Sequence, residues 1–175
     1  MPSTLSSVGL PLRSILWALL LPGIIAGYLP WRFFGLREVG IDLTAPSHRA
    51  GLLCVGIGAP LLLACIVEFA RSGRGTLAPV DPPKELVVQG LYRYVRNPMY
   101  LAVALLLAGE FLLTFSRGLL AFGLIWFVWI NLFVILYEEP ALTRKFGASY
   151  ERYKRDVRRW VPTFSSPRAA AAPPR

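Results

Sequence analysis

The sequence is poor in the residues on which most metal and hydrolytic sites are built. It holds one histidine, His48, and two cysteines, Cys54 and Cys65. A single histidine cannot supply the imidazole and thiolate cluster of a zinc site, nor can it serve a Ser–His–Asp arrangement from an outer loop. The two cysteines are about three helical turns apart, too far to form a disulfide. We therefore expect no bound metal, no disulfide and no hydrolytic triad.

Charged residues are also scarce, at 17% of 175 residues against 55% hydrophobic, whereas soluble domains carry about 25% charged residues. Four apolar runs occupy roughly residues 12–29, 50–70, 98–115 and 119–137. A soluble chain of this length could not bury four runs of membrane-spanning length. The sequence therefore predicts an all-α integral membrane protein with about four transmembrane helices. The second run holds three small residues that would allow close helix packing: Gly51, Gly56 and Gly58.

Acidic residues are the scarcer charge, with 10 Asp and Glu against 19 Lys and Arg and a net charge of +9. The positive excess lies between and after the apolar runs, where it would meet anionic lipid headgroups rather than nucleic acid. With both termini in the cytoplasm, fifteen of the 19 basic residues fall on the cytoplasmic side. The positive-inside rule therefore predicts this orientation.

The last two apolar runs are separated by a very short link, residues 116–118, which predicts a tight antiparallel hairpin. Pro140 suits the first turn of a new helix, and apolar residues then recur at three- and four-residue spacing. We expect short amphipathic helices there, divided near Gly147. Residues 163–175 have the composition of a disordered tail, which leaves residues 1–162 as one domain.

Two residue pairs of possible functional importance stand at the predicted cytoplasmic ends of the hairpin helices. Asn97 and Pro98 are typical of a helix start, where free N–H groups can bind a carboxylate or phosphate. Glu138 and Glu139 stand where the last transmembrane helix is expected to end, against the preference of the helix dipole. Together these ends could hold a zwitterion, although plain helix ends at the lipid boundary remain the alternative.

Glu110 is the one acidic residue inside the third apolar run. It is expected about 18 Å along the helix from Asn97, beyond the middle of the bilayer. A carboxyl group at membrane depth is a functional candidate, so Glu110 is a candidate substrate-contacting residue. An ion pair with Arg117 is the structural alternative.

A set of short motifs spans residues 75–162 in a characteristic order. They are Lys84-Glu85-Leu86-Val87, Gly90-Leu91-Tyr92-Arg93, Arg96-Asn97-Pro98-Met99-Tyr100, Glu138-Glu139-Pro140-Ala141-Leu142, Phe146-Gly147, Tyr150, Tyr153 and residues 157–162. With these motifs the chain resembles the isoprenylcysteine carboxyl methyltransferase-like family, which is similar to the phospholipid methyltransferases. The resemblance implies methyl transfer from S-adenosylmethionine to a lipid-embedded acceptor at the cytoplasmic face, here of a bacterial inner membrane.

The resemblance also implies roles for particular residues. The cofactor-binding part would cover about residues 75–162. Leu86, Val87 and Tyr92 would line the cofactor pocket. The methionine part would meet a second group of residues: Asn97, Pro98, Met99 and Tyr100. Glu138 would hold its ammonium group, with Glu139 as a less certain second member and a weak candidate for a general base.

Two positions depart from the eukaryotic members of the family. Asn97 stands where those enzymes have histidine, and it cannot act as a base. Val134 stands where they have a substrate-associated arginine, which argues against a prenylcysteine carboxylate as the acceptor. The acceptor therefore stays open among a lipid amine, a thiol, a carboxylate or another small hydrophobic molecule.

Methyl transfer suits a sequence without an obvious nucleophile or metal set. The sulfonium already activates the methyl group, so the protein mainly positions the reactants and excludes water. Two other interpretations stay open from the sequence. One is an NADPH-dependent sterol- or enone-type membrane reductase, and the other is a non-catalytic scaffold or lipid-binding protein in which the polar residues are ordinary helix ends.

Overall fold

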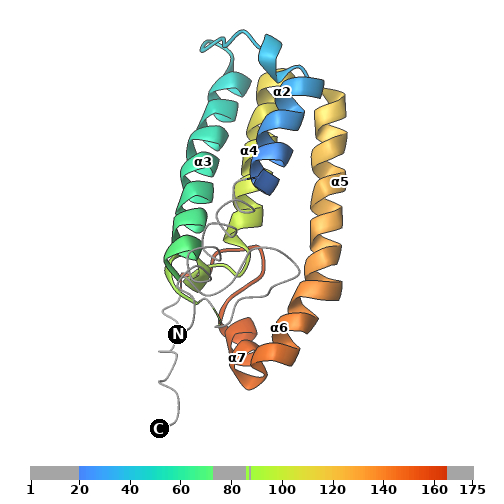
Figure 1. Cartoon of the computed structure of the whole chain (residues 1–175). Coiled ribbons are helices and arrows are strands. Elements are labelled where there is room, and N and C mark those ends of the chain that lie inside the picture. Colours follow the sequence, from blue (N-terminus) through green and yellow to red (C-terminus); the bar gives the residue numbers. More distant parts are fainter. Residues whose placement is uncertain (1–19, 73–85, 87, 165–175) are drawn as a thin grey trace, which may run out of the picture.

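The computed structural model describes residues 20–72, 86 and 88–164, and these form helices and connecting loops without strands (Figure 1). After a helical start at residue 20, the elements are η1 (Ile24–Tyr28), α2 (Leu29–Phe33), η2 (Leu36–Glu38), α3 (Pro46–Ser72), η3 (Gly90–Arg93), α4 (Pro98–Thr114), α5 (Arg117–Phe133), η4 (Val134–Glu138), α6 (Glu139–Phe146) and α7 (Ala148–Asp156). The α-helical class expected from the sequence is thus confirmed for the described part of the chain.

Two of the described helices are long and apolar enough to cross a membrane, Pro46–Glu68 and Arg117–Phe146. The apolar helix Pro98–Thr114 is shorter. The span expected at residues 12–29 lies partly outside the described residues. The long helices expose large apolar side chains, as helices in lipid do: Leu53, Ile57 and Leu63 on α3, Leu124, Ile125, Val128 and Trp129 on α5, and Leu136 on η4.

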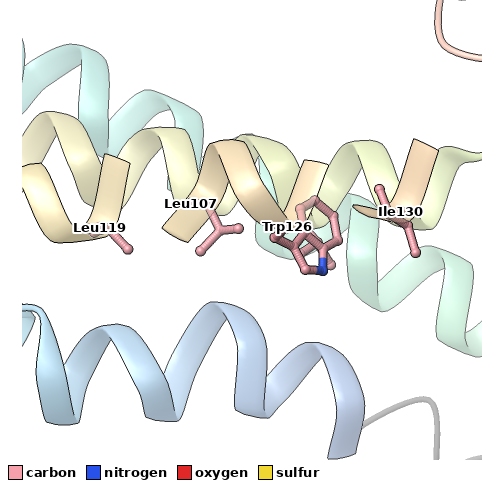
Figure 2. Close-up of a cluster of buried hydrophobic side chains, with 5 residues drawn as sticks. Leu107, Leu119, Trp126 and Ile130 are labelled. Carbon is pink, nitrogen blue, oxygen red and sulfur yellow. The ribbon is translucent and has the colours of Figure 1, made fainter. Parts of the chain in front are cut away.

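Helices α4 and α5 form the expected hairpin. Phe115 ends α4 in the left-handed conformation, with φ of 47°. Ser116 then caps α5, because its Oγ accepts a hydrogen bond from the Leu119 N–H at 3.3 Å. Buried side chains of both helices form one cluster (Figure 2): Val103, Leu107, Leu119, Trp126 and Ile130. Ile25, Ala26 and Phe34 from the N-terminal segment pack against this cluster.

Helix α3 packs against α4 with their backbones in direct contact. A Cβ atom added to Gly51 would lie 2.8 Å from the carbonyl oxygen of Gly109, and one added to Gly109 would lie 2.7 Å from the carbonyl oxygen of Gly51. One added to Gly58 would lie 3.2 Å from the Ala102 oxygen. Gly56, in contrast, faces open space. Close packing is therefore confirmed at two of the three predicted glycines of α3, and Gly56 has no such role.

Replacing Gly51 by leucine is expected to destabilise the fold by at least about 1–3 kcal/mol, because the new side chain must separate the two backbones. The midpoint of thermal unfolding in detergent measures the effect. Gly56→Leu is the matched control, since it makes the same change on the exposed face of the same helix. Equal unfolding midpoints for the two variants would contradict the packing described above.

The helix that contains the acidic pair does not end where the sequence suggested. α5 continues through the π-helical turn η4 into α6, so Glu138 and Glu139 lie within a helix that runs from Arg117 to Phe146. Pro140 removes one backbone hydrogen bond and its ring crowds the preceding turn, and the wider π turn accommodates it. The argument that the pair opposes a helix dipole was therefore wrong. The predicted break at Gly147 is confirmed, with φ of 52° between α6 and α7.

Candidate functional site

The two polar groups expected to converge do meet, at the end of the bundle opposite the α4–α5 turn. The hydroxyl of Tyr100, on the first turn of α4, donates a hydrogen bond to Oε2 of Glu138 at 3.3 Å. Glu138 is half-buried. A carboxylate with one oxygen held by a phenol and some surface still accessible can accept further hydrogen bonds from a cationic group.

The loop before α4 lies beside this pair. Tyr92 belongs to η3, and its carbonyl accepts a 2.6 Å hydrogen bond from the Tyr153 hydroxyl of α7. Burial, together with the nearby carboxyl group of Glu138, raises the pKa of Tyr92 well above its usual value. Tyr92 therefore stays neutral.

Gly90 allows the backbone of this loop to turn. Its φ is 55°, a conformation that glycine adopts readily. A Cβ atom at Gly90 would also overlap the carboxylate of Glu68, which comes from the end of α3. The positive φ favours glycine, whereas the carboxylate of Glu68 ends a flexible side chain and could move aside. The short approach shows that the loop of Tyr92 lies against the end of α3.

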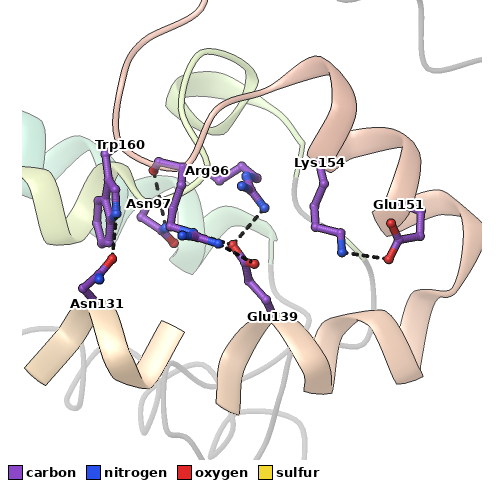
Figure 3. A network of polar contacts seen from close by, with 8 residues as sticks. Arg96, Asn97, Asn131, Glu139, Glu151, Lys154 and Trp160 are labelled. Atoms are coloured by element: carbon purple, nitrogen blue, oxygen red, sulfur yellow. Dashed lines mark hydrogen bonds and ion pairs between the residues drawn. The ribbon is translucent and has the colours of Figure 1, made fainter. Parts of the chain in front are cut away.

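Glu139 makes a different set of contacts from its neighbour. Its Oε1 accepts hydrogen bonds from Nη1 of Arg96 at 2.9 Å and from Nε of Arg159 at 2.7 Å. Its Oε2 accepts one from Nη2 of Arg159 at 2.9 Å (Figure 3). The side chains of Arg96 and Glu139 are only 11% and 13% exposed. The hydrogen bond to Glu139 raises the pKa of Arg159, so the pair stays charged.

The residues around Asn97 are more enclosed than a free helix end. Asn97 occupies the N-cap position of α4, but its side chain caps no N–H of that helix. Its Nδ2 instead donates to the carbonyl oxygen of Arg159 at 3.4 Å, and the residue is buried. Met99 is buried between α4 and α3 against Cys65 and Ile66. The free N–H groups of Met99 and Tyr100 remain, as at any helix start.

Leu86 lies against α7. It packs on the buried cluster of Tyr150, Tyr153 and Val157, together with Val88, Leu142 and Phe146. Burial raises the pKa of Tyr150 to about 12, so it is neutral as well. Val87, the other predicted pocket residue of this segment, lies outside the described residues.

Sequence reasoning missed the two arginines of the Glu139 network and the contact between Asn131 and Trp160. Nε1 of Trp160 donates a 3.0 Å hydrogen bond to Oδ1 of Asn131, which lies in an otherwise apolar helix (Figure 3). A lone asparagine in an apolar helix signals a required partner. Nothing in the sequence singled out Arg159 among the many basic residues near it.

Glu110 does not take part in this arrangement. It lies ten residues along α4 from Tyr100, about 15 Å away along the helix axis. The residue is 6% exposed, and its Oε2 has no hydrogen-bond partner among the described residues. The described part of the chain shows no ion pair between Glu110 and Arg117.

Replacing Glu110 by leucine is expected to leave stability unchanged or to raise it by up to about 1–3 kcal/mol, because an unsatisfied buried polar atom is removed. Thermal unfolding in detergent measures this. Leu107→Ala, one turn away in the same buried face, is the reference and should cost about 2–5 kcal/mol. A loss for Glu110→Leu as large as that of Leu107→Ala would show that the carboxyl group has an essential partner.

Two described helices of membrane-spanning length, with polar residues gathered at one end of the bundle, fit an α-helical membrane protein. The phospholipid methyltransferase family model matches residues 46–149, from the start of α3 into α7. The chain belongs to the phospholipid methyltransferase family. It is also 44% identical over 64 residues to an uncharacterized protein of Haemophilus influenzae, a match that covers 36% of this chain and all of that protein. No solved structure matches the chain.

Proposed function

We propose that the protein transfers the methyl group of S-adenosylmethionine to a lipid-embedded or small hydrophobic acceptor at the cytoplasmic membrane surface. The hydrogen-bonded pair of Tyr100 and Glu138 beside the Tyr92 loop carries this proposal. The pair lies within the region that matches the methyltransferase family. It is also a polar site at the end of helices suited to a membrane, where a soluble cofactor and a lipid can meet.

The residues present fit such a cofactor. The half-buried carboxylate of Glu138 suits the ammonium of its methionine part, and the free N–H groups at the start of α4 suit its carboxylate. We assign the adenosine part to the apolar and aromatic residues of the preceding segment, Leu86, Val87 and Tyr92. Pro98 and Met99 then act by shaping the start of α4, because Met99 is buried against α3.

The bound cofactor would supply a methyl group already activated by its sulfonium. The protein's part is to hold donor and acceptor in line and to keep water away. We propose that Glu139 is a positioning residue rather than a base, because three hydrogen bonds from two arginines occupy its oxygens. It thereby ties the start of α4 to the segment after α7.

The distribution of basic residues supports the cytoplasmic assignment. The site end of the bundle carries Arg93, Arg96, Arg144, Lys145 and the basic residues of α7, whereas four arginines lie at the opposite end: Arg32, Arg37, Arg49 and Arg117. Basic residues favour the cytoplasmic side of a membrane. We therefore place the site at the cytoplasmic face of a bacterial inner membrane.

Methyl transfer can be tested with purified protein in vesicles. S-adenosylmethionine with a tritiated methyl group is added outside, and radioactivity is counted in the lipid extract. Vesicles that contain a primary-amine phospholipid are compared with vesicles of choline and glycerol phospholipids alone. We expect label in the extract that is lost in Glu138→Ala.

Two results would contradict the proposal: folded protein that labels no membrane component, including those of native membranes, or a Glu138→Ala variant as active as the wild type. NADPH serves as the comparison ligand. A thermal shift with NADPH and none with S-adenosylhomocysteine would favour the reductase instead.

A further inference from the structure

The segment after α7 folds into a small closed loop, residues 158–163, which we call the Trp160 loop. The N–H of Arg158 donates to Oγ1 of Thr163 at 3.4 Å, which closes the loop on itself. Two backbone hydrogen bonds fasten it to the segment before α4. The Arg96 N–H donates to the Arg158 carbonyl at 2.9 Å, and the Thr163 N–H donates to the Tyr94 carbonyl at 2.7 Å.

The tip of this loop packs on the hairpin helices. The indole of Trp160 packs against the buried cluster shared by α4 and α5, and its ring centre lies 5.4 Å from that of Phe127. Its N–H bonds Asn131, whose amide would otherwise lack a partner inside an apolar helix. Figure 3 shows the indole pointing from the loop toward α5.

The contact between Trp160 and Asn131 lies nearer the middle of the bundle than Glu138 does. Asn131 precedes Glu138 by seven residues, about 10 Å along the helix axis, and the π-helical turn η4 begins between them. Val134, between them, is buried. Arg159, the neighbour of Trp160, donates to Glu139, and its carbonyl accepts from Asn97, while Trp160 itself packs on the apolar core of the hairpin. Trp160 therefore joins the candidate site to that apolar core.

We propose that Trp160, held by Asn131, is the gate through which a membrane acceptor reaches the site. The identity of that acceptor as a lipid rests on the proposed function. In the closed state the indole, packed on the apolar core of the hairpin, separates the site from lipid. Release of its hydrogen bond to Asn131 lets the indole leave, and an acyl or isoprenoid chain can take its place. The size of this side chain then limits which acceptors enter.

The gate can be observed without any methyl transfer. The full chain is labelled with 5-fluorotryptophan, placed in lipid nanodiscs, and its ¹⁹F resonances are assigned by single Trp→Phe variants. A phosphatidylcholine with a nitroxide on its acyl chain then broadens every tryptophan that meets lipid. Trp129, which is 61% exposed on α5, gives the reference for full contact.

In the wild type, the Trp160 resonance should be broadened several-fold less than that of Trp129. Asn131→Leu keeps the helix apolar but removes the acceptor, so the Trp160 resonance should shift and approach the broadening of Trp129. Asn131→Ala gives a second test if the first variant does not fold. Val128→Leu, on the exposed side of α5, should change nothing.

A Trp160 resonance as broadened as that of Trp129 in the wild type would overturn the proposal. An unchanged, protected Trp160 in both Asn131 variants would overturn it as well. S-adenosylhomocysteine is titrated into the same wild-type samples. Its failure to bind would count against the methyltransferase proposal and leave the nitroxide result to decide the gate.

Discussion

Replacing Glu138 by glutamine is expected to weaken the binding of S-adenosylhomocysteine by about 10- to 100-fold. A hydrogen bond to a charged group contributes about 1.5–3 kcal/mol, and each 1.4 kcal/mol is a factor of ten in affinity. Glutamine keeps the shape of the side chain and can still accept the hydrogen bond from Tyr100. The fold should therefore survive while the negative charge is lost. Isothermal titration of the purified protein in detergent gives the affinity.

The control for this variant is Glu151→Gln on α7. Glu151 forms a 2.7 Å ion pair with Lys154 at the surface, and its substitution removes the same charge from the same end of the molecule. Its affinity should stay close to that of the wild type. If both variants bound equally well, Glu138 would have no part in holding the cofactor.

Glu139→Ala should have the largest effect on stability, a loss of about 3–5 kcal/mol. Its removal leaves Arg96 and Arg159 without their shared carboxylate, and Arg96 is largely buried. Breaking a buried ion pair from one side costs about this much. Thermal unfolding in detergent should show a large fall in midpoint. The loop of Trp160 should also become susceptible to limited proteolysis, because Arg159 fastens it to α6.

Glu151→Ala provides the comparison again, since an exposed pair contributes about 0–1 kcal/mol. A Glu139 variant as stable as the Glu151 variant would mean that the network does not hold the site together. A stable Glu139 variant that loses only methyl transfer would favour a direct role of Glu139 in the chemistry.

The sequence predicted the features that depend on local pattern. The helical class, the hairpin at Ser116 and the break at Gly147 follow from apolar runs, short links and glycine. The close packing at Gly51 and Gly58 follows from residue size. These features need no knowledge of distant contacts.

The path of the helix at Pro140 and the individual partners of the polar side chains could not be predicted. The helix runs through Glu138 and Glu139 because a π turn accommodates Pro140, which outweighs the usual effect of proline. Asn97 turns from its expected cap toward Arg159, which is far along the chain. Glu138 and Glu139 are adjacent and chemically identical, yet only the structure separates a half-buried carboxylate beside Tyr100 from one held by two arginines.

Photo-cross-linking with 8-azido-S-adenosylmethionine tests most directly where the cofactor binds. Membranes that contain the protein are irradiated with the probe, with and without excess S-adenosylhomocysteine, and the labelled peptides are identified by mass spectrometry. We predict label that the competitor abolishes, within residues 86–100 or 138–157. Competed label only at the opposite end of the bundle, in residues 36–49 or 114–118, or folded protein without competed label, would contradict the account.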